Sequence, residues 1–428
     1  MNKTQTTSEF DYLNQPLLTI IAHIFGQARA YMDALPKWEK AIHIWWLLGP
    51  FILLIERSPA DLWLSICVLA FIIRAFIKKQ TQWLKAFWVR AAFVFWAVAI
   101  LSALVSADPA YAFGEAFIWF RFPLFAMAAV FWLGIDRRMI YAMMLTTLFG
   151  LLIMCGILTA EIFIEGQKGG RLSWPYGDLV PGNYVAKVGL PIFTVMVALA
   201  VSVKGRIAAL AGVFALVTML ISVMTGERIN LLIRACGGML AGLVWKPNWK
   251  RYIGLVAVEI LAVVIVFQAL PDVGNRYVNS FINQLPTGNQ SPYYKTMLPG
   301  VMAFEQAPIL GIGTGNFRNM CEEVVGSEID NLKCLNHPHN FYIQMAGETG
   351  IIGLITGTIF LWSIIWLCFK ASWRNRDNVI IATAWVVPFG LFWPITSSAD
   401  FFGQWNNIFM WSAVALAMTA VNIPKKED

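Results

Sequence analysis

Residues 207–224 read IAALAGVFALVTMLISVM, a stretch without a charged side chain that directly follows Lys204 and Arg206. A helix needs about 20 predominantly apolar residues to cross the ~30 Å hydrocarbon core of a bilayer. Basic residues beside such a helix mark its cytoplasmic end. This stretch therefore predicts a membrane-spanning helix that begins on the cytoplasmic side.

The same pattern recurs along the whole chain. Of its 428 residues, 58% are hydrophobic and 13% are charged, whereas a soluble globular domain carries about 25% charged residues. This composition excludes a disordered chain, a small disulfide scaffold and a soluble nucleic-acid binder. The sequence predicts an all-α, polytopic membrane protein of about twelve spans. The predicted spans are 38–55, 59–77, 86–105, 116–133, 140–164, 188–203, 207–224, 229–244, 252–270, 344–369, 379–394 and 408–422.

Basic residues alternate between the predicted connections. One set of connections holds fifteen, and the other short connections hold five: Arg57, Lys168, Arg171, Lys187 and Arg228. The positive-inside rule places the richer set, and with it both termini, in the cytoplasm. The predicted organisation is a cytoplasmic segment 1–37, nine spans over 38–270, a large outward loop 271–343, three spans over 344–422 and a cytoplasmic tail 423–428.

The loop 271–343 is far longer than an ordinary connection, and loops of this length are usually functional or disordered. Its aromatic residues and an apolar stretch near 296–304 with helical spacing predict a folded cap of short helices. Cys321 and Cys334 both lie in it, and an oxidising compartment would allow them to pair. The sequence leaves open whether they do.

Two of the four histidines, His337 and His339, lie within three residues at the outer end of a predicted span. Histidine is the side chain best suited to accept a proton near neutral pH, although both could be ordinary interfacial residues. Asn340 could accept a hydrogen bond from a ring N–H and fix the tautomer. The glycine run GIGTGNF at 311–317 lacks the Lys-Ser/Thr of a phosphate-binding P-loop, so we interpret it as a tight turn in the cap.

Arginines are the second group of candidate residues. Arg171, Arg228 and Arg276 fall on the predicted outer side, where contact with lipid headgroups is the alternative interpretation. Arg121 falls inside the fourth span, where an ionisable residue is costly and usually lines a functional cavity or pairs with an acid. Arginine makes planar, bidentate contacts with phosphate oxygens. Several such residues facing one side suit a lipid-linked phosphate or diphosphate.

Together, these residues suit glycosyl transfer from a lipid diphosphate sugar. The histidine would activate an acceptor hydroxyl, and the arginines would stabilise the charge on the departing diphosphate. The outward loops show no carboxylate pair of the kind that metal-dependent glycosyltransferases use, so we expect no metal and no other cofactor.

Three elements resemble the signature of the O-antigen ligase and polymerase superfamily. They are Gly311-x-Gly313-x-Gly315-Asn316-Phe317, His337-Pro-His339-Asn340-x-Tyr342 and Glu348-x-Gly350-x-x-Gly353. The resemblance implies a bacterial inner-membrane protein with about twelve spans and one large periplasmic loop. It also implies transfer of O-antigen polysaccharide from undecaprenyl diphosphate to a hydroxyl of the lipid A–core oligosaccharide, with inversion.

The resemblance also assigns roles to individual residues. The family's essential histidine falls on His337 or His339, without a choice between them. Its functional arginines fall on Arg228 and Arg276, with Arg171 and Arg121 as weaker matches. Lys295 stands where many members have an arginine, and Asn340 and Glu348 are supporting residues.

Other functions remain open from the sequence. An O-antigen polymerase or an O-linked protein oligosaccharyltransferase would use the same donor and differ only in the acceptor. A secondary transporter would show repeat symmetry and broken helices near the midplane, and we find no internal repeat. The expected partners are the lipid-linked glycan, lipid A–core and membrane lipids, with no nucleic acid. The sugars, the oligomeric state and the role of residues 1–37 stay undetermined.

Overall fold

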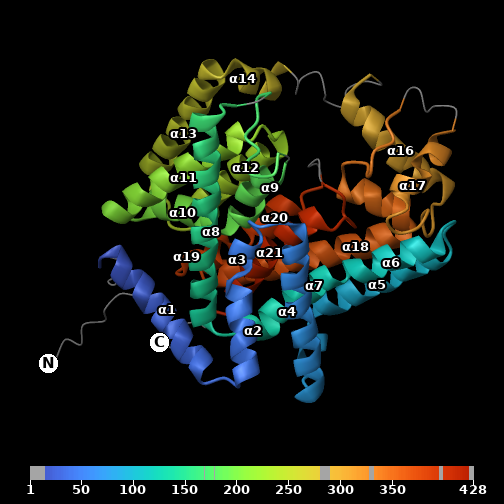
Figure 1. The fold of residues 1–428 in the computed structure, drawn as a ribbon, viewed down its shortest axis with the longest axis horizontal. Helices are drawn as coiled ribbons and strands as arrows, with labels where there is room; N and C mark the ends of the chain where they lie inside the picture. The colour runs from blue at the N-terminus through green and yellow to red at the C-terminus, as the bar shows by residue number, and fades with distance from the viewer. Residues whose placement is uncertain are drawn as a thin grey trace.

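The computed structural model describes residues 15–167, 169–177, 179–279, 290–326, 332–394 and 399–423. Within these ranges the chain is built from helices and contains no strand (Figure 1). The first part of the chain comprises α1 Leu17–Asp33, α2 Lys37–Leu47, α3 Gly49–Ile52, α4 Arg57–Ile77, α5 Phe87–Leu104, α6 Pro109–Trp119, α7 Arg121–Ala128, the π-helix Ala129–Leu133 and α8 Arg137–Ile164.

The middle of the chain contributes a second group of helices. These are α9 Val180–Asn183, the π-helix Tyr184–Val188, α10 Leu190–Ser202, α11 Arg206–Met224, α12 Arg228–Val244 and α13 Trp249–Ala269. The last part comprises α14 Pro271–Tyr277, α16 Pro292–Gln306, α17 Phe317–Val325, α18 Phe341–Arg374, α19 Val379–Ala384, α20 Val386–Leu391 and α21 Trp405–Ala420.

The predicted all-helical, multi-pass membrane architecture is confirmed, but the number of twelve spans is not. Among the described residues, seven helices are long and apolar enough to cross a membrane, and a pair bent by 50° between Val188 and Leu190 brings the number to eight. The other predicted spans are helical but short or interrupted. α2 ends at Leu47 and the four-residue α3 begins with Gly49 and Pro50, Pro388 lies in the short α20, and α21 has 16 residues.

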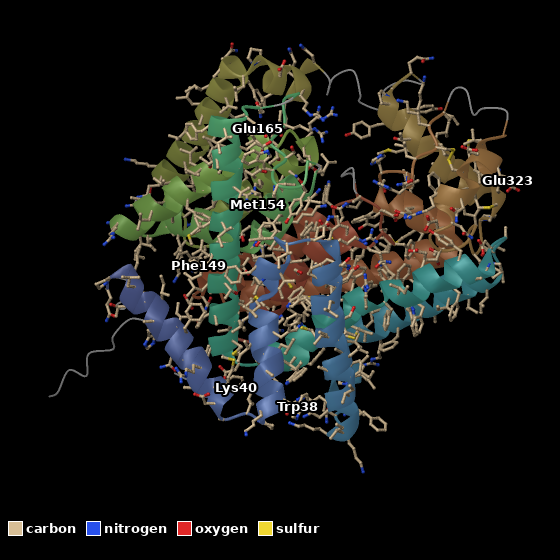
Figure 2. The ribbon with its side chains drawn as sticks, in the orientation of Figure 1. Trp38, Lys40, Phe149, Met154, Glu165 and Glu323 are labelled. Atoms are coloured by element: carbon tan, nitrogen blue, oxygen red, sulfur yellow. A yellow bond between two sulfur atoms is a disulfide. The ribbon has the colours of Figure 1, made fainter. Side chains whose placement is uncertain are left out.

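α8 illustrates the pattern of a complete span. Its 28 residues extend about 42 Å at 1.5 Å per residue, enough to cross a bilayer. Asp136 caps its first turn by accepting from the Arg138 backbone N–H at 2.8 Å. In Figure 2 the apolar Met154 and Phe149 lie along the helix, below the polar Glu165 at its end.

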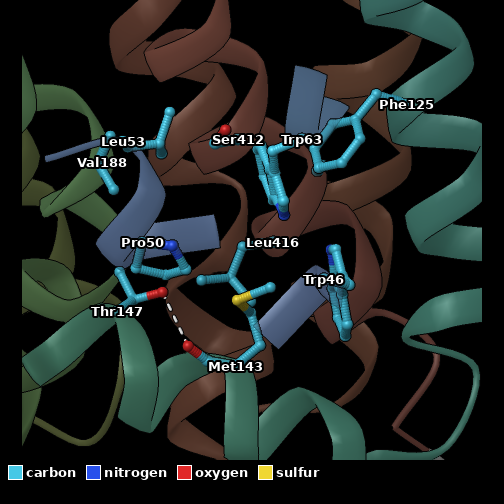
Figure 3. A pocket seen from close by; sticks show the side chains of 11 residues that line it. Trp46, Pro50, Leu53, Trp63, Phe125, Met143, Thr147, Val188, Ser412 and Leu416 are labelled. Carbon is cyan, nitrogen blue, oxygen red and sulfur yellow. Dashed lines mark hydrogen bonds between the residues drawn. The ribbon is translucent and has the colours of Figure 1, made fainter. Parts of the chain in front are cut away.

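The core of the molecule surrounds α21. Nearly every residue of this helix from Asn407 to Ala420 is buried, and it packs against α4, α7, α8 and α20. A small apolar cavity of about 20 Å³ lies beside it, between Trp46, Trp63, Phe125 and Leu416 (Figure 3). Its polar neighbour Thr147 donates to the Met143 carbonyl at 2.7 Å. The cavity is a packing gap about one water in size, and we assign it no function.

The predicted cap of short helices is confirmed for the part of 271–343 that the structure describes. α14, α16 and α17 lie in this region, with α14 at the top of Figure 1 and α16 and α17 at its upper right. Cys321 and Cys334, whose pairing the sequence left open, form a disulfide with Cα atoms 5.5 Å apart. The disulfide ties α17 to the segment that leads to His337. The position of the cap outside a membrane stays a prediction.

A glycine contact joins the cap to α18. Gly350 adopts φ 66° and ψ −169° inside α18, a conformation essentially restricted to glycine. A Cβ atom there would lie 2.2 Å from the carbonyl carbon of Ile309. At Gly311, which has φ +73°, a Cβ atom would lie 2.2 Å from the carbonyl carbon of Glu348. The motif glycines therefore allow two backbone segments to pack directly against each other.

We predict that Gly350→Ala lowers the thermal unfolding midpoint of the detergent-purified protein. The backbone conformation alone should cost about 1–3 kcal/mol, and the Ile309 backbone must also move. Gly254→Ala is the control, because Gly254 lies in α13 with open space around its Cα. An unchanged midpoint in Gly350→Ala would contradict the contact.

Candidate functional site

Three segments far apart in sequence meet at Gly226, between α11 and α12. Gly226 adopts φ +73°, and a Cβ atom there would lie 2.6 Å from the Gly170 carbonyl oxygen and 2.7 Å from Cγ of Arg171. Arg276 donates from Nε to the Gly226 carbonyl at 2.8 Å. The turn therefore brings the side chains of Arg171 and Arg276 against its own backbone, two residues before Arg228.

Further hydrogen bonds fix this junction. The Leu172 backbone N–H donates to the Met224 carbonyl at 2.9 Å, and the Gln167 side-chain amide donates to the same carbonyl at 2.7 Å. The Tyr277 hydroxyl donates to the Val223 carbonyl at 3.0 Å. Burial, and next the nearby Glu227 carboxylate, raise the pKa of Tyr277, so this hydroxyl keeps its proton. We call residues 167, 169–172, 223–228 and 272–277 the arginine junction.

The histidines belong to a second group of segments, at the start of α18. Asn340 caps α18, because its side-chain oxygen accepts from the backbone N–H groups of Tyr342 and Ile343 at 2.9 and 3.1 Å. Just before it, His339 adopts φ 55°, a region that non-glycine residues seldom occupy. The ring centroids of His337 and His339 are 4.4 Å apart. The two imidazole rings therefore lie next to each other, and we call them the histidine pair.

α16 supports the histidine segment from behind. A Cβ atom on Gly300 would lie 2.8 Å from Cβ of Pro338, and one on Gly347 would lie 2.8 Å from the Gly300 carbonyl oxygen. Glycines on both helices thus permit the close approach of α16 and α18. This packing places Pro338, which lies between the two histidines, directly against α16.

Glu348 fixes the glycine run to α18. Its carboxylate accepts from the backbone N–H of Gly315 at 2.7 Å and of Phe317 at 3.3 Å, and from the Gln344 amide at 3.2 Å. The side chain is 1% exposed. Glu348 therefore supports the turn at 311–317, which confirms that the glycine run is a tight turn of the cap.

The arginine junction and the histidine pair line one cavity of about 470 Å³. We call it the main cavity. Its charged and imidazole side chains come from the predicted site residues and from three others. The predicted ones are Arg171, Arg228, Arg276, His337 and His339, and the others are Lys187, Glu227 and Lys333. In Figure 1, α12 and α14, which carry Arg228 and Arg276, face α16 and the start of α18, which the histidines directly precede.

Four predicted site residues lie outside the lining of the main cavity. Arg121 donates to Asp61 Oδ1 at 2.7 Å and also bonds to Gln404. Lys295 donates to the Gln290 side chain at 2.9 Å. Asn340 and Glu348 have the supporting contacts given above. The structure therefore brings together the histidines and three of the four arginines, and places Arg121 elsewhere.

Lys187 and Lys333 were missed as site residues by the sequence analysis. Lys187 was assigned to the outward connection 165–187, but it lies in the π-helix Tyr184–Val188 and is 9% exposed. The preceding Pro181-Gly182 pair was a signal for a broken helix, since Gly182 leaves no room for a side chain against Glu227 and Thr225. Lys333 precedes Cys334 of the disulfide, a pairing the sequence left open.

The main cavity is strongly cationic. Five of its lining residues are lysine or arginine and one is a glutamate. Such a site attracts polyanions, and arginine favours phosphate oxygens. Within the described residues, no group of three or more His, Cys, Asp or Glu side chains could hold a metal ion. The chemistry available to these residues is anion binding next to an imidazole pair.

We predict that Gly226→Ala weakens anion binding in the main cavity. The added methyl group would displace Arg171 and the Gly170 carbonyl, and the residue would also be strained at φ +73°. Binding is measured by the rise in unfolding midpoint that inorganic diphosphate produces. We expect a clear rise in the original protein and little or none in the variant.

Gly166→Ala is the matched control for this experiment. Gly166 has φ +69°, and no other group lies within 4 Å of the place that its added methyl group would take. The control therefore reproduces the backbone strain without the collision. Equal diphosphate responses in the two variants would show that the arginine junction does not organise the anion site.

Comparisons with known proteins bear on the same region. No curated protein sequence matches the chain. A solved structure described as "Structural coordination of polymerization and crosslinking by a peptidoglycan synthase complex" is similar over 78% of this chain and 96% of its own, with 14% identity and a TM-score of 0.46. The family model described as O-antigen ligase matches residues 211–358. This range runs from α11 through the cap to α18 and includes Arg228, Arg276 and both cavity histidines. The match over residues 211–358 supports the resemblance to the O-antigen ligase superfamily.

Proposed function

We propose that this protein transfers a glycan from a lipid-linked diphosphate donor to a sugar hydroxyl, as an O-antigen ligase. The observation that carries the proposal is the shared lining of the main cavity, where Arg171, Arg228 and Arg276 meet His337 and His339. A lipid diphosphate sugar offers one group for each set: anionic oxygens for the arginines and an anomeric carbon for attack beside the imidazoles.

The arginine junction would bind the diphosphate and stabilise its departure. When the bond between the anomeric carbon and the phosphate oxygen breaks, negative charge grows on that oxygen. Cations held in place before the reaction stabilise this charge without reorganising. Arg276 is already fixed by its bond to the Gly226 carbonyl, and Lys187 adds a buried cation to the lining.

One histidine of the pair would act as the general base. The acceptor hydroxyl oxygen attacks the anomeric carbon, its proton passes to an imidazole nitrogen, and the diphosphate leaves from the opposite face. A single displacement of this kind inverts the anomeric centre. The reaction needs no metal in this scheme, because arginine and lysine supply the positive charge.

The donor we propose is O-antigen on undecaprenyl diphosphate, and the acceptor is the lipid A–core oligosaccharide. The apolar helices and the family match support a membrane setting with lipid-linked polysaccharide. We place the protein in the bacterial inner membrane, with the 271–343 cap and the main cavity on the periplasmic side and both termini in the cytoplasm.

Substitution of the histidines tests the proposed chemistry. We expect His337→Ala or His339→Ala, whichever removes the base, to lower kcat about 10²- to 10⁴-fold, and the double variant to be inactive. The assay uses purified protein, lipid-linked O-antigen and lipid A–core, with His23→Ala in α1 as the control. Full activity in the double variant would refute the proposal.

The same assay identifies the acceptor. A second lipid-linked glycan and a pilin-like protein are offered in parallel with lipid A–core. Transfer to lipid A–core supports the ligase. Transfer to either of the others alone would reassign the acceptor and make the protein a polymerase or a protein oligosaccharyltransferase.

Substitutions of Arg228 and Arg121 distinguish an arginine that acts in the reaction from one that stabilises the fold. We expect Arg228→Gln to lower kcat/KM about 10²- to 10³-fold, the usual effect of removing one charge-stabilising group. Arg29→Gln is the control, because the Arg29 side chain is 81% exposed in α1. Arg121→Gln should instead lower the unfolding midpoint, because it breaks the contact with Asp61. An equal loss of kcat/KM in Arg121→Gln and Arg228→Gln would contradict this division.

A further inference from the structure

A second polar cavity lies next to the main cavity and has no role in the proposal above. Its volume is about 200 Å³. Four parts of the fold contribute to it: the start of α4, α6, α17 and the segment that leads into α21. The lining residues are Arg57, Glu115, Arg318, Asp400, Gly403, Gln404, Trp405 and Asn406. We call it the side cavity.

The two cavities differ in charge. The side cavity is lined by two arginines and two carboxylates, so its charges balance, whereas the main cavity has a large cationic excess. A diphosphate would therefore be drawn to the main cavity. The side cavity instead offers hydrogen-bond donors and acceptors of both kinds to a ligand without net charge.

Several bonds hold Asp400 in the lining of the side cavity. Asp400 forms an ion pair with Arg318, and it accepts from the Gln344 amide at 2.7 Å and from the Phe402 backbone N–H at 3.0 Å. Burial tends to lower the pKa of Arg318, but the adjacent Asp400 carboxylate outweighs it, so the pKa is raised overall and the guanidinium keeps its charge. A wall fixed in this way loses little freedom when a ligand binds.

Glu115, Arg57 and Trp405 also line the side cavity. The aliphatic part of Glu115 packs against Gly315, where a Cβ atom would lie 2.8 Å from Glu115 Cγ. The Arg57 side chain is 54% exposed. Trp405 is held by Phe409, with ring centroids 4.6 Å apart. A carboxylate, a guanidinium, an amide and an indole are the groups that bind sugar hydroxyls and the apolar face of a sugar ring.

The side cavity adjoins the reaction site. Asn406 lines both cavities, while Ala399 lines the main cavity and its neighbour Asp400 lines the side cavity. Gln344, which bonds to Asp400, lies in the first turns of α18, directly after the histidine pair. A ligand in the side cavity would therefore lie beside the main cavity, which the imidazoles line.

We propose that the side cavity binds one uncharged sugar ring of a glycan that reaches into the main cavity. This inference rests on the proposed function, because only a glycan transferase would bring a glycan into the main cavity. The volume of the side cavity, about 200 Å³, fits a single sugar ring and not a long polysaccharide. The ring belongs either to the acceptor core oligosaccharide or to the donor's repeat unit, and the two sources are separated by experiment.

The test measures binding of lipid-free sugars to the full-length protein in detergent by titration calorimetry. The probes are core oligosaccharide released from lipid A and the repeat unit released from the donor. We expect one of them to bind, and Glu115→Gln and Arg57→Gln each to weaken its binding at least tenfold. Binding of the core oligosaccharide assigns the acceptor, and binding of the repeat unit assigns the donor.

Two matched control variants show whether a loss of sugar binding is specific to the side cavity. Glu323→Gln removes a carboxylate from the exposed edge of α17, at the right of Figure 2, and Arg29→Gln removes a distant exposed arginine. Both should bind as the original protein does. Because Arg57 is largely exposed, its substitution tests the site even if Glu115→Gln lowers the unfolding midpoint.

The outcome is distinguishable from that of the proposed function. Sugar binding that survives in the double histidine variant and is lost in Arg57→Gln supports the side cavity, whether or not transfer occurs. Glycan transfer by Glu115→Gln and Arg57→Gln with unchanged KM for donor and acceptor would overturn the inference and leave the proposed function standing. Failure of both probes to bind would overturn it as well.

Discussion

The close backbone contact at Gly226 is the constraint on which the site depends. Arginine side chains repel one another when they are brought together, and a protein must hold them against that repulsion. Here the backbone does so: the turn at Gly226 admits the Gly170 carbonyl and the Arg171 stem, and its own carbonyl accepts from Arg276. A side chain at position 226 would separate the segments by the width of a methyl group. The cationic wall of the main cavity is therefore held by main-chain packing at Gly226, together with the hydrogen bond from Arg276 to the Gly226 carbonyl.

The histidine wall is organised on the same principle with different groups. The glycines at 300 and 347 let α16 cross α18 closely, and Gly311 and Gly350 let the cap turn lie on the α18 backbone. Glu348 then accepts from the turn's backbone N–H groups. The glycines of the sequence motif serve as points of close approach, with no phosphate-binding role of their own. Their effect on chemistry is to fix where α18 begins and so where the imidazoles lie.

The sequence predicted those parts of the fold that depend on local composition. Long apolar runs indicated the helical, multi-pass architecture, and the helical spacing near 296–304 anticipated α16. The number of spans was harder, because Pro50, Pro388 and the π-helix at Tyr184–Val188 break or shorten helices whose composition is apolar throughout. Arg171, Arg228 and Arg276 could be nominated by type and side. Lys187 could not be nominated, because its inward position depends on that π-helix. The contacts of Arg121 could not be predicted either, because its partners Asp61 and Gln404 lie far from it in sequence.

The difference in charge between the two cavities suggests how one site can hold two chemically different parts of a glycolipid. A cationic cavity without its anion is electrostatically unfavourable, and a bound diphosphate relieves that repulsion, so binding and local stability are linked. The charge-balanced side cavity has no such excess and gains from hydrogen bonds alone. Binding in the main cavity should therefore weaken as salt rises, whereas binding in the side cavity should change little. The segment 399–406 contributes to the lining of both environments, and Asn406 lines both cavities.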